Sequence, residues 1–195
     1  MHEKACCPDA SVAGRLLRRP QRRDGLDHPQ SGHLRRCPCH DRADGRGRWK
    51  ASPERVFQAF ADQEKKDKWF GGGADWTPVG RSFDFREGGR EYAAGRWKTG
   101  MVSKFDCIYH DIVPPSGAEA GRIIYSYVMH LDERKISVSQ ATIELVPEKD
   151  GTKLILTKYG DYLDGYDDAG SREHGTNFLM DALGRSLGEA APGPQ

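Results

Sequence analysis

Histidines, thiols and clustered carboxylates are the residues of this chain that could catalyse a reaction or bind a metal. Three histidines, His110, His130 and His174, follow residue 50, and none has a sequence neighbour that suggests a catalytic triad. A polar residue near a helix end is the simpler interpretation of His174. We therefore predict no catalytic residue, and the pattern favours a protein that is not an enzyme.

A metal site is not indicated either. His33, Cys37, Cys39 and His40 carry suitable donor atoms, but Cys-x-Cys is not the Cys-x2-Cys spacing of a zinc finger. The carboxylates of residues 161–168 lack the ligand order of a calcium-binding EF-hand loop, so we interpret this stretch as a solvated loop. We expect no metal and no cofactor.

Charge is distributed unevenly along the 195 residues. Residues 1–50 hold twelve Lys and Arg against six Asp and Glu, whereas the remainder holds eighteen against twenty-three. A weakly acidic body is a poor nucleic-acid binder, because contacts to phosphate dominate that affinity. No run approaches the roughly 18 apolar residues of a membrane helix, and the start lacks an apolar signal-peptide core. We expect no nucleic-acid or membrane partner and a cytoplasmic location.

The composition divides the chain into three parts. Residues 1–49 are rich in Arg, Gly, Pro, His and Cys and show no periodicity, so we interpret them as a disordered or aberrant basic segment. A shifted reading frame in a GC-rich gene is one hypothesis for this bias. A folded domain is predicted over 50–188, followed by a frayed tail over 189–195.

Helix signals mark the start of the domain. Ser52 is a suitable N-cap with Pro53 at the first helical position, and Asp62 is a suitable cap for a second short helix that ends near Phe70. The glycine run 71–73 is not followed by Gly-Lys-Ser/Thr, which argues against a phosphate-binding loop.

Strands and a final helix complete the predicted domain. Short alternating runs bounded by turn residues predict an antiparallel meander. A long amphipathic helix, with Ser171 as its N-cap, is predicted to end near Leu187. The runs cover residues 81–87, 90–98, 101–113, 122–131, 135–146 and 152–159.

The order of these elements resembles the helix-grip fold of the START-like, or SRPBCC, superfamily. Several short motifs are similar to those of its bacterial branch related to the activator of the heat shock protein 90 ATPase. They are Ala51-Ser52-Pro53-Glu54-Arg55-Val56-Phe57, Trp69-Phe70, Gly88-Gly89, Gly151-Thr152-Lys153-Leu154 and His174-Gly175-Thr176.

The resemblance implies an α+β fold in which a meander of about six strands wraps around the C-terminal helix. The chain departs from it at two points. Asn177 stands where such proteins usually have Trp. The first strand, expected just before Ala51, is not recognisable, because residues 41–48 have almost no apolar positions.

The resemblance also implies a cavity between sheet and helix. In the run 122–131, Tyr125, Tyr127 and Met129 share one face, which we assign inward because the other face holds the hydrophilic members. The candidate ligand-binding residues are Trp69, Phe83, Phe85, Trp97, Tyr125, Tyr127, Met129, Leu154, Phe178 and Leu183.

Three functions remain open on this basis. The leading one is non-catalytic binding of a hydrophobic small molecule, which needs an internal cavity. The first alternative is a polyketide cyclase-like or hydrolase-like enzyme, which needs a histidine or carboxylate in the cavity with a shifted pKa. The second is an interaction module like the chaperone ATPase activators, which needs an exposed apolar or charged patch. A chaperone or homodimer partner is therefore also left open.

Overall fold

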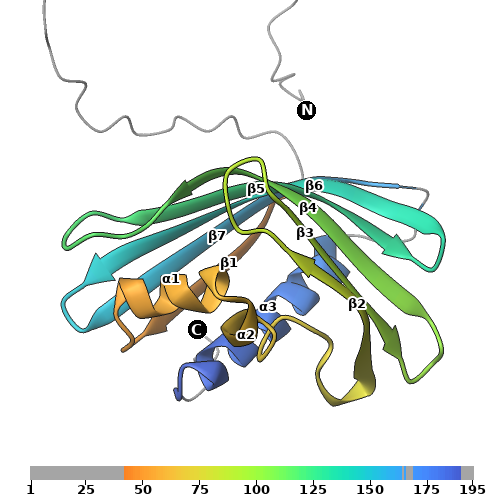
Figure 1. Ribbon diagram of the computed structural model, residues 1–195, viewed down its shortest axis with the longest axis horizontal. Helices are drawn as coiled ribbons and strands as arrows, with labels where there is room; N and C mark the ends of the chain where they lie inside the picture. Colours follow the sequence, from red (N-terminus) through yellow and green to blue (C-terminus); the bar gives the residue numbers. More distant parts are fainter. Residues whose placement is uncertain (1–41, 164, 166–168, 190–195) are drawn as a thin grey trace, which may run out of the picture. The chain divides into compact units, whose positions relative to one another are not determined.

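The computed structural model describes residues 42–163, 165 and 169–189. Of the two units into which the chain divides, Met1–Cys39 and His40–Gln195, the described residues all belong to the second. The predictions for residues 1–41, including the four zinc-ligand candidates, and for 190–195 lie outside them. No described helix is both long and apolar enough to span a membrane. In chain order the elements are β1 (Arg42–Trp49), α1 (Pro53–Ala61), α2 (Gln63–Lys66), the 3-10 turn η1 (Gly73–Asp75), β2 (Trp76–Phe83), β3 (Arg90–Trp97), β4 (Val102–Val113), β5 (Gly121–Leu131), β6 (Arg134–Glu148), β7 (Gly151–Tyr162) and α3 (Ala169–Ser186) (Figure 1).

The strands form one antiparallel sheet in the order β1-β7-β6-β5-β4-β3-β2. Strands β2 to β7 follow one another as a meander, and β1 joins the sheet beside β7 at the opposite edge from β2. The sheet is curved, and α1, α2 and α3 lie on its concave side (Figure 1). This is the predicted α+β helix-grip fold, with seven strands rather than about six.

Strand β1 corrects the interpretation of residues 1–49 as uniformly without structure. Residues 42–49 pair with β7 over their whole length, from Arg42 opposite Tyr159 to Trp49 opposite Thr152. The strand lacks an apolar alternation because Gly47, on the inner face, leaves its space to the Trp49 indole. Strand β1 is therefore held by its backbone pairing with β7 and by the Trp49 ring. It lacks the row of alternating apolar side chains by which a strand is recognised in a sequence.

Three boundaries also differ from the predictions. The second helix, α2, ends at Lys66 rather than near Phe70, and residues 67–69 form a turn. Strand β2 runs over Trp76–Phe83 rather than 81–87, because the chain turns after Phe83 to pair with β3. The first half of β2 was not predicted because it contains Pro78, which is unfavourable inside a sheet. Proline is tolerated at this position because β2 is an edge strand with a bulge after Pro78. Helix α3 begins at Ala169, so Ser171 is a helical residue and not the N-cap.

The caps of the first two helices are confirmed. The Ser52 hydroxyl accepts a hydrogen bond from the Arg55 amide, and the Asp62 carboxylate accepts one from the Lys65 amide. Helix α1 buries the apolar side chains of Val56, Phe57 and Phe60, whereas the buried residue of α2 is Lys66. The core contains, among others, Trp49, Val56, Phe57, Phe60, Trp69, Tyr109, Ile123, Leu145, Leu154, Leu156, Leu183 and Leu187.

Candidate functional site

A cavity of about 500 Å³ lies between the concave face of the sheet and α3. Its volume falls within the range of roughly 300–1,000 Å³ that small-molecule sites occupy. Most of its wall is apolar, and aromatic rings are prominent in it. The lining residues include Phe60, Trp69, Phe70, Trp76, Trp97, Met101, Ser103, Lys104, Phe105, Tyr125, Tyr127, Met129, Ile136, Ile143, Leu156, Lys158, Arg172, Thr176, Phe178 and Met180.

Strand pairing builds the aromatic part of the wall. Tyr125, Tyr127 and Met129 alternate along β5 onto the inner face, as predicted, and Phe105 of β4 pairs with Met129. The ring centroids of Tyr125 and Tyr127 are 5.7 Å apart, and those of Phe105 and Tyr127 are 5.3 Å apart. Such contacts hold the rings in place, so the wall is formed without a ligand.

Tryptophans from two neighbouring strands border the same cavity. The indole nitrogens of Trp76 on β2 and Trp97 on β3 both donate to the Ser103 hydroxyl oxygen, each at 3.1 Å. Gly72 lies against both rings, where a Cβ atom would overlap them. The glycine run thus brings the chain close to aromatic rings, consistent with the absence of a phosphate-binding motif.

Six of the ten candidate residues line this cavity, namely Trp69, Trp97, Tyr125, Tyr127, Met129 and Phe178. Their role in binding stays a prediction. The other four were wrongly placed in its wall. Leu154 and Leu183 are fully buried in the core, whereas Phe85 packs edge-on against Phe57 and Tyr109 and stacks with Phe83. Alternation assigned the correct face but did not show how deeply each side chain is covered.

Lys158 is the most informative lining residue that the sequence analysis missed. On β7 it continues the inward series Leu154, Leu156, Lys158. Its Nζ atom donates to the hydroxyl oxygen of Thr176 on α3 at 2.5 Å. Burial, together with the positive charge of Arg172, lowers the pKa of the Lys158 amine to about 7. Extending the inward alternation of β7 by two residues would have found it.

A second cation lies at this end of the cavity. Arg172 of α3 donates to the hydroxyl oxygen of the buried Ser137 at 2.8 Å. Its guanidinium carbon lies 5.9 Å from the ring centroid of Tyr127 and 6.0 Å from that of Tyr162. These contacts come from β5, β6 and β7, so Arg172 is positioned by the sheet as well as by its own helix.

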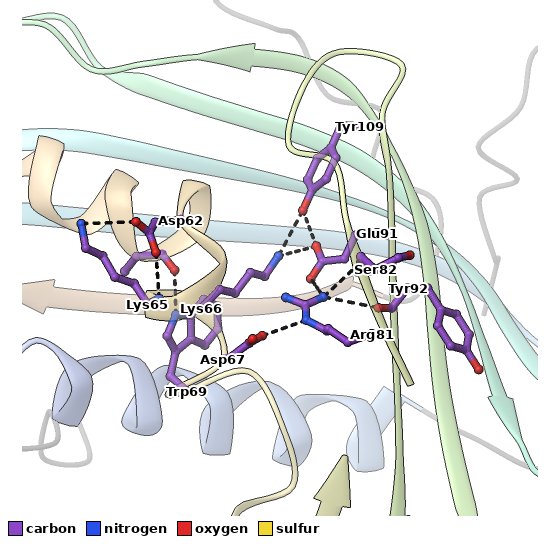
Figure 2. A network of polar contacts seen from close by, with 11 residues as sticks. Asp62, Lys65, Lys66, Asp67, Trp69, Arg81, Ser82, Glu91, Tyr92 and Tyr109 are labelled. Atoms are coloured by element: carbon purple, nitrogen blue, oxygen red, sulfur yellow. Dashed lines mark hydrogen bonds and ion pairs between the residues drawn. The ribbon is translucent and has the colours of Figure 1, made fainter. Parts of the chain in front are cut away.

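A buried ion-pair network, drawn in Figure 2, lies around a small pocket that shares Phe60, Trp69 and Phe105 with the wall of the cavity. Fully buried Glu91 of β3 accepts from Lys66 at 2.5 Å, from Arg81 at 2.7 Å and from the Tyr109 hydroxyl. Burial alone would raise the pKa of Glu91, but the positive charge of Lys66, with hydrogen bonds from Lys66 and Tyr109, outweighs it and holds the pKa below its ordinary value. Burial and the Glu91 charge raise the pKa of Tyr109 far above its ordinary value. Glu91 thus stays ionised and Tyr109 neutral around neutrality, which suits a structural tie between α2, β2, β3 and β4 rather than acid–base chemistry.

Other reactive groups give little support for catalysis. Cys107 is buried on β4, and burial raises the pKa of its thiol to about 12, so it is unreactive near neutrality. Among the residues that the structure describes, no group of three or more His, Cys, Asp and Glu is placed to hold a metal ion.

Comparison with known proteins identifies the family. Residues 50–189 match the family described as activator of Hsp90 ATPase homolog 1-like protein. The chain belongs to this family. The match supports the predicted resemblance to the corresponding branch of the SRPBCC superfamily. No curated protein sequence matches the chain significantly.

Solved structures with the fold of the activator of Hsp90 ATPase homolog 1-like family agree with this. A protein from Rhizobium leguminosarum is 37% identical, with a TM-score of 0.70 over 76% of this chain and 95% of that one. The protein Mll3558 from Rhizobium loti is also 37% identical, with a TM-score of 0.67 over 76% and 98%. An AHSA1-like protein from Aeromonas hydrophila shares the fold at 19% identity, with a TM-score of 0.57 over 75% and 92%.

Asn177, the other departure from the branch's motifs, is exposed on α3 and does not line the cavity of this family member. The adjacent Phe178 lines it instead and is 40% exposed, near Gly73. Position 177 therefore contributes no contact to the cavity wall in this chain.

Proposed function

We propose that this protein binds a hydrophobic small molecule, without catalysis, in the cavity between the sheet and α3. The observation that carries the proposal is the size and lining of the cavity: about 500 Å³, with rings from β2 to β5 and from α3 in its wall. Displacing water from such a wall favours an apolar guest, at about 25 cal/mol for each Å² removed from water.

The side chains in the wall favour binding over the enzymatic alternative. That alternative needs a histidine or carboxylate facing the cavity. Within residues 42–163, 165 and 169–189, the ionisable groups other than tyrosine that line it are Lys104, Lys158 and Arg172. His110 is instead hydrogen-bonded at 2.7 Å to Ser126, which alternates away from the inward tyrosines of β5.

An interaction with a chaperone or a second copy of the chain stays a prediction. It would need a contiguous exposed surface. In the described part of the chain, the large apolar side chains exposed by more than a third are Val79, Met101, Val113, Val138 and Phe178, of which Met101 and Phe178 line the cavity.

The test is native mass spectrometry of protein purified from its own host, combined with a cavity-filling variant. We expect a small molecule bound to the wild type and absent from Met129→Trp, whose larger ring occupies the cavity. Val138→Trp, at an exposed position outside the lining, is the matched control and retains the molecule. A folded wild type that carries no small molecule and takes up no apolar dye such as 1-anilinonaphthalene-8-sulfonate would overturn the proposal.

A further inference from the structure

We propose that the ligand is an amphipathic monoanion, an apolar body with a carboxylate head, and that Lys158 binds the carboxylate inside the cavity. This inference rests on the proposed function and adds the chemical class of the ligand. The structure supports it through the position of Lys158, the charges around it and the hydrogen bonds that orient it.

The position of Lys158 is unusual for a lysine. It follows Leu154 and Leu156 on the inward face of β7 and lines the cavity rather than the outer surface. A cation held among apolar groups costs free energy unless a partner compensates it. An apolar residue would fill this position at lower cost, so the lysine needs an explanation beyond packing.

The charged side chains among the described lining residues are all cationic. Lys158 of β7 and Arg172 of α3 lie at the same end of the cavity, and no described Asp or Glu lines it. The Nζ atom of Lys104, the third cation, lies 2.7 Å from the exposed carboxylate of Glu133. An anionic head group would therefore meet positive charge at the end formed by β7 and α3 and apolar rings elsewhere.

Hydrogen bonds leave donors of Lys158 for a ligand. The Thr176 hydroxyl donates to the backbone carbonyl of Arg172 at 2.7 Å, so a lone pair of its oxygen can receive the bond from Lys158. An ammonium group has three donors, and within the described residues Thr176 is the hydrogen-bond partner of Lys158. A carboxylate can accept the remaining donors in charge-assisted hydrogen bonds.

The balance of charge favours a carboxylate over a phosphate. One amine that titrates near neutrality and one guanidinium that also hydrogen-bonds Ser137 provide few donors for a dianion. A bound carboxylate would raise the pKa of Lys158 towards its ordinary value, because an opposite charge favours the ammonium form. Binding would then be accompanied by proton uptake near neutral pH.

The experiment compares decanoic acid with decan-1-ol, which share an alkyl chain and differ in head-group charge. Their dissociation constants are measured by calorimetry and tryptophan fluorescence for wild type, Lys158→Met and the matched control Lys153→Met, which lies on the opposite face of the same strand and does not line the cavity. We expect Lys158→Met to raise the dissociation constant of decanoic acid at least tenfold. The dissociation constant of decan-1-ol should stay within threefold of the wild-type value, so the ratio of the two constants changes. Lys153→Met leaves that ratio within threefold of wild type.

The possible outcomes separate the two proposals. If wild type binds both probes and Lys158→Met does not change their ratio, the assignment of the carboxylate to Lys158 is overturned while binding of an apolar molecule stands. If folded wild type binds neither probe, the proposed function is overturned and this inference with it. Circular dichroism of each variant establishes that the compared proteins are folded.

Discussion

The indole of Trp49 on β1 lies directly against Gly184 on α3. A Cβ atom at position 184 would stand 2.8 Å from the indole nitrogen, closer than normal packing allows. The ring is 3% exposed, and Gly47 on its own strand leaves it the space it occupies. Glycine at 184 therefore sets how closely the C-terminal helix approaches the first strand.

Replacing Gly184 with alanine is expected to destabilise the protein by about 1–3 kcal/mol, because overpacking outweighs the better helix propensity of alanine. Gly175 of the same helix is the control, since a Cβ atom there meets nothing within 4 Å. Gly175→Ala is expected to stabilise by up to about 1 kcal/mol. Urea unfolding measures the change in unfolding free energy for both variants. If both variants were stabilised, or both destabilised, this account of the Trp49 contact would be contradicted.

Replacing Glu91 with glutamine is expected to cost about 3–5 kcal/mol, because it leaves the buried Lys66 ammonium without its carboxylate. Asp67→Asn is the matched control, because Asp67 binds the same Arg81, at 2.8 Å, but its side chain is 44% exposed. That exposed pair is expected to contribute less than about 1 kcal/mol. Similar losses for the two variants in chemical denaturation would argue against a special role of the buried carboxylate.

The stabilisation by Glu91 is expected to depend on pH. Its pKa is lowered in the folded state from the ordinary value of 4.5, so the stabilisation is fully present above that pH and is lost as pH falls towards the folded-state pKa. The difference in unfolding free energy between wild type and Glu91→Gln should thus shrink below pH 4.5. Denaturant unfolding between pH 3 and 7 provides the profile, and a constant difference would be the contrary result.

Lys158→Met is expected to be more stable than wild type, by roughly 1 kcal/mol or more below pH 7, because it removes a cation from an apolar wall. The folded-state pKa of Lys158 is about 7 against 10.5 ordinarily, so the unfolded chain binds more protons between these values and wild-type stability rises across that window. The advantage of the variant should therefore decrease from pH 7 to 10.5.

Other ionisable groups line the same cavity as Lys158, and their effect on the pH dependence of stability must be separated from that of Lys158. In the part of the chain that the structure describes, the others that line the cavity are Arg172 on α3, Lys104 on β4, and Tyr125 and Tyr127 on β5. The hydrogen bond from Lys104 to Glu133 raises the pKa of Lys104, which gives a dependence of opposite sign. Lys104→Met is thus the control for the unfolding series, and a wild type more stable than Lys158→Met at pH 6 would refute the prediction.

Local patterns were enough to predict the helix starts at Ser52 and Asp62, five of the six predicted strand runs and the inward face of β5. These features depend on caps, turns and alternation, which act between residues close in the chain. The helix-grip arrangement followed from the order of the elements and from motifs that resemble a known family. Of the six cavity candidates that line the cavity, Tyr125, Tyr127 and Met129 were found by strand alternation, whereas Trp69 and Phe178 lie outside the strands.

Only the tertiary structure showed β1, the depth of burial and the charge inside the cavity. Strand β1 is held by pairing with β7 and by Trp49 against Gly184, contacts between residues more than a hundred positions apart. Lys158 resembles a surface lysine in the sequence, and it lines a cavity because α3 crosses above it. Hydrophobic periodicity reports the face of a residue, whereas its neighbours are set by segments that meet only on folding.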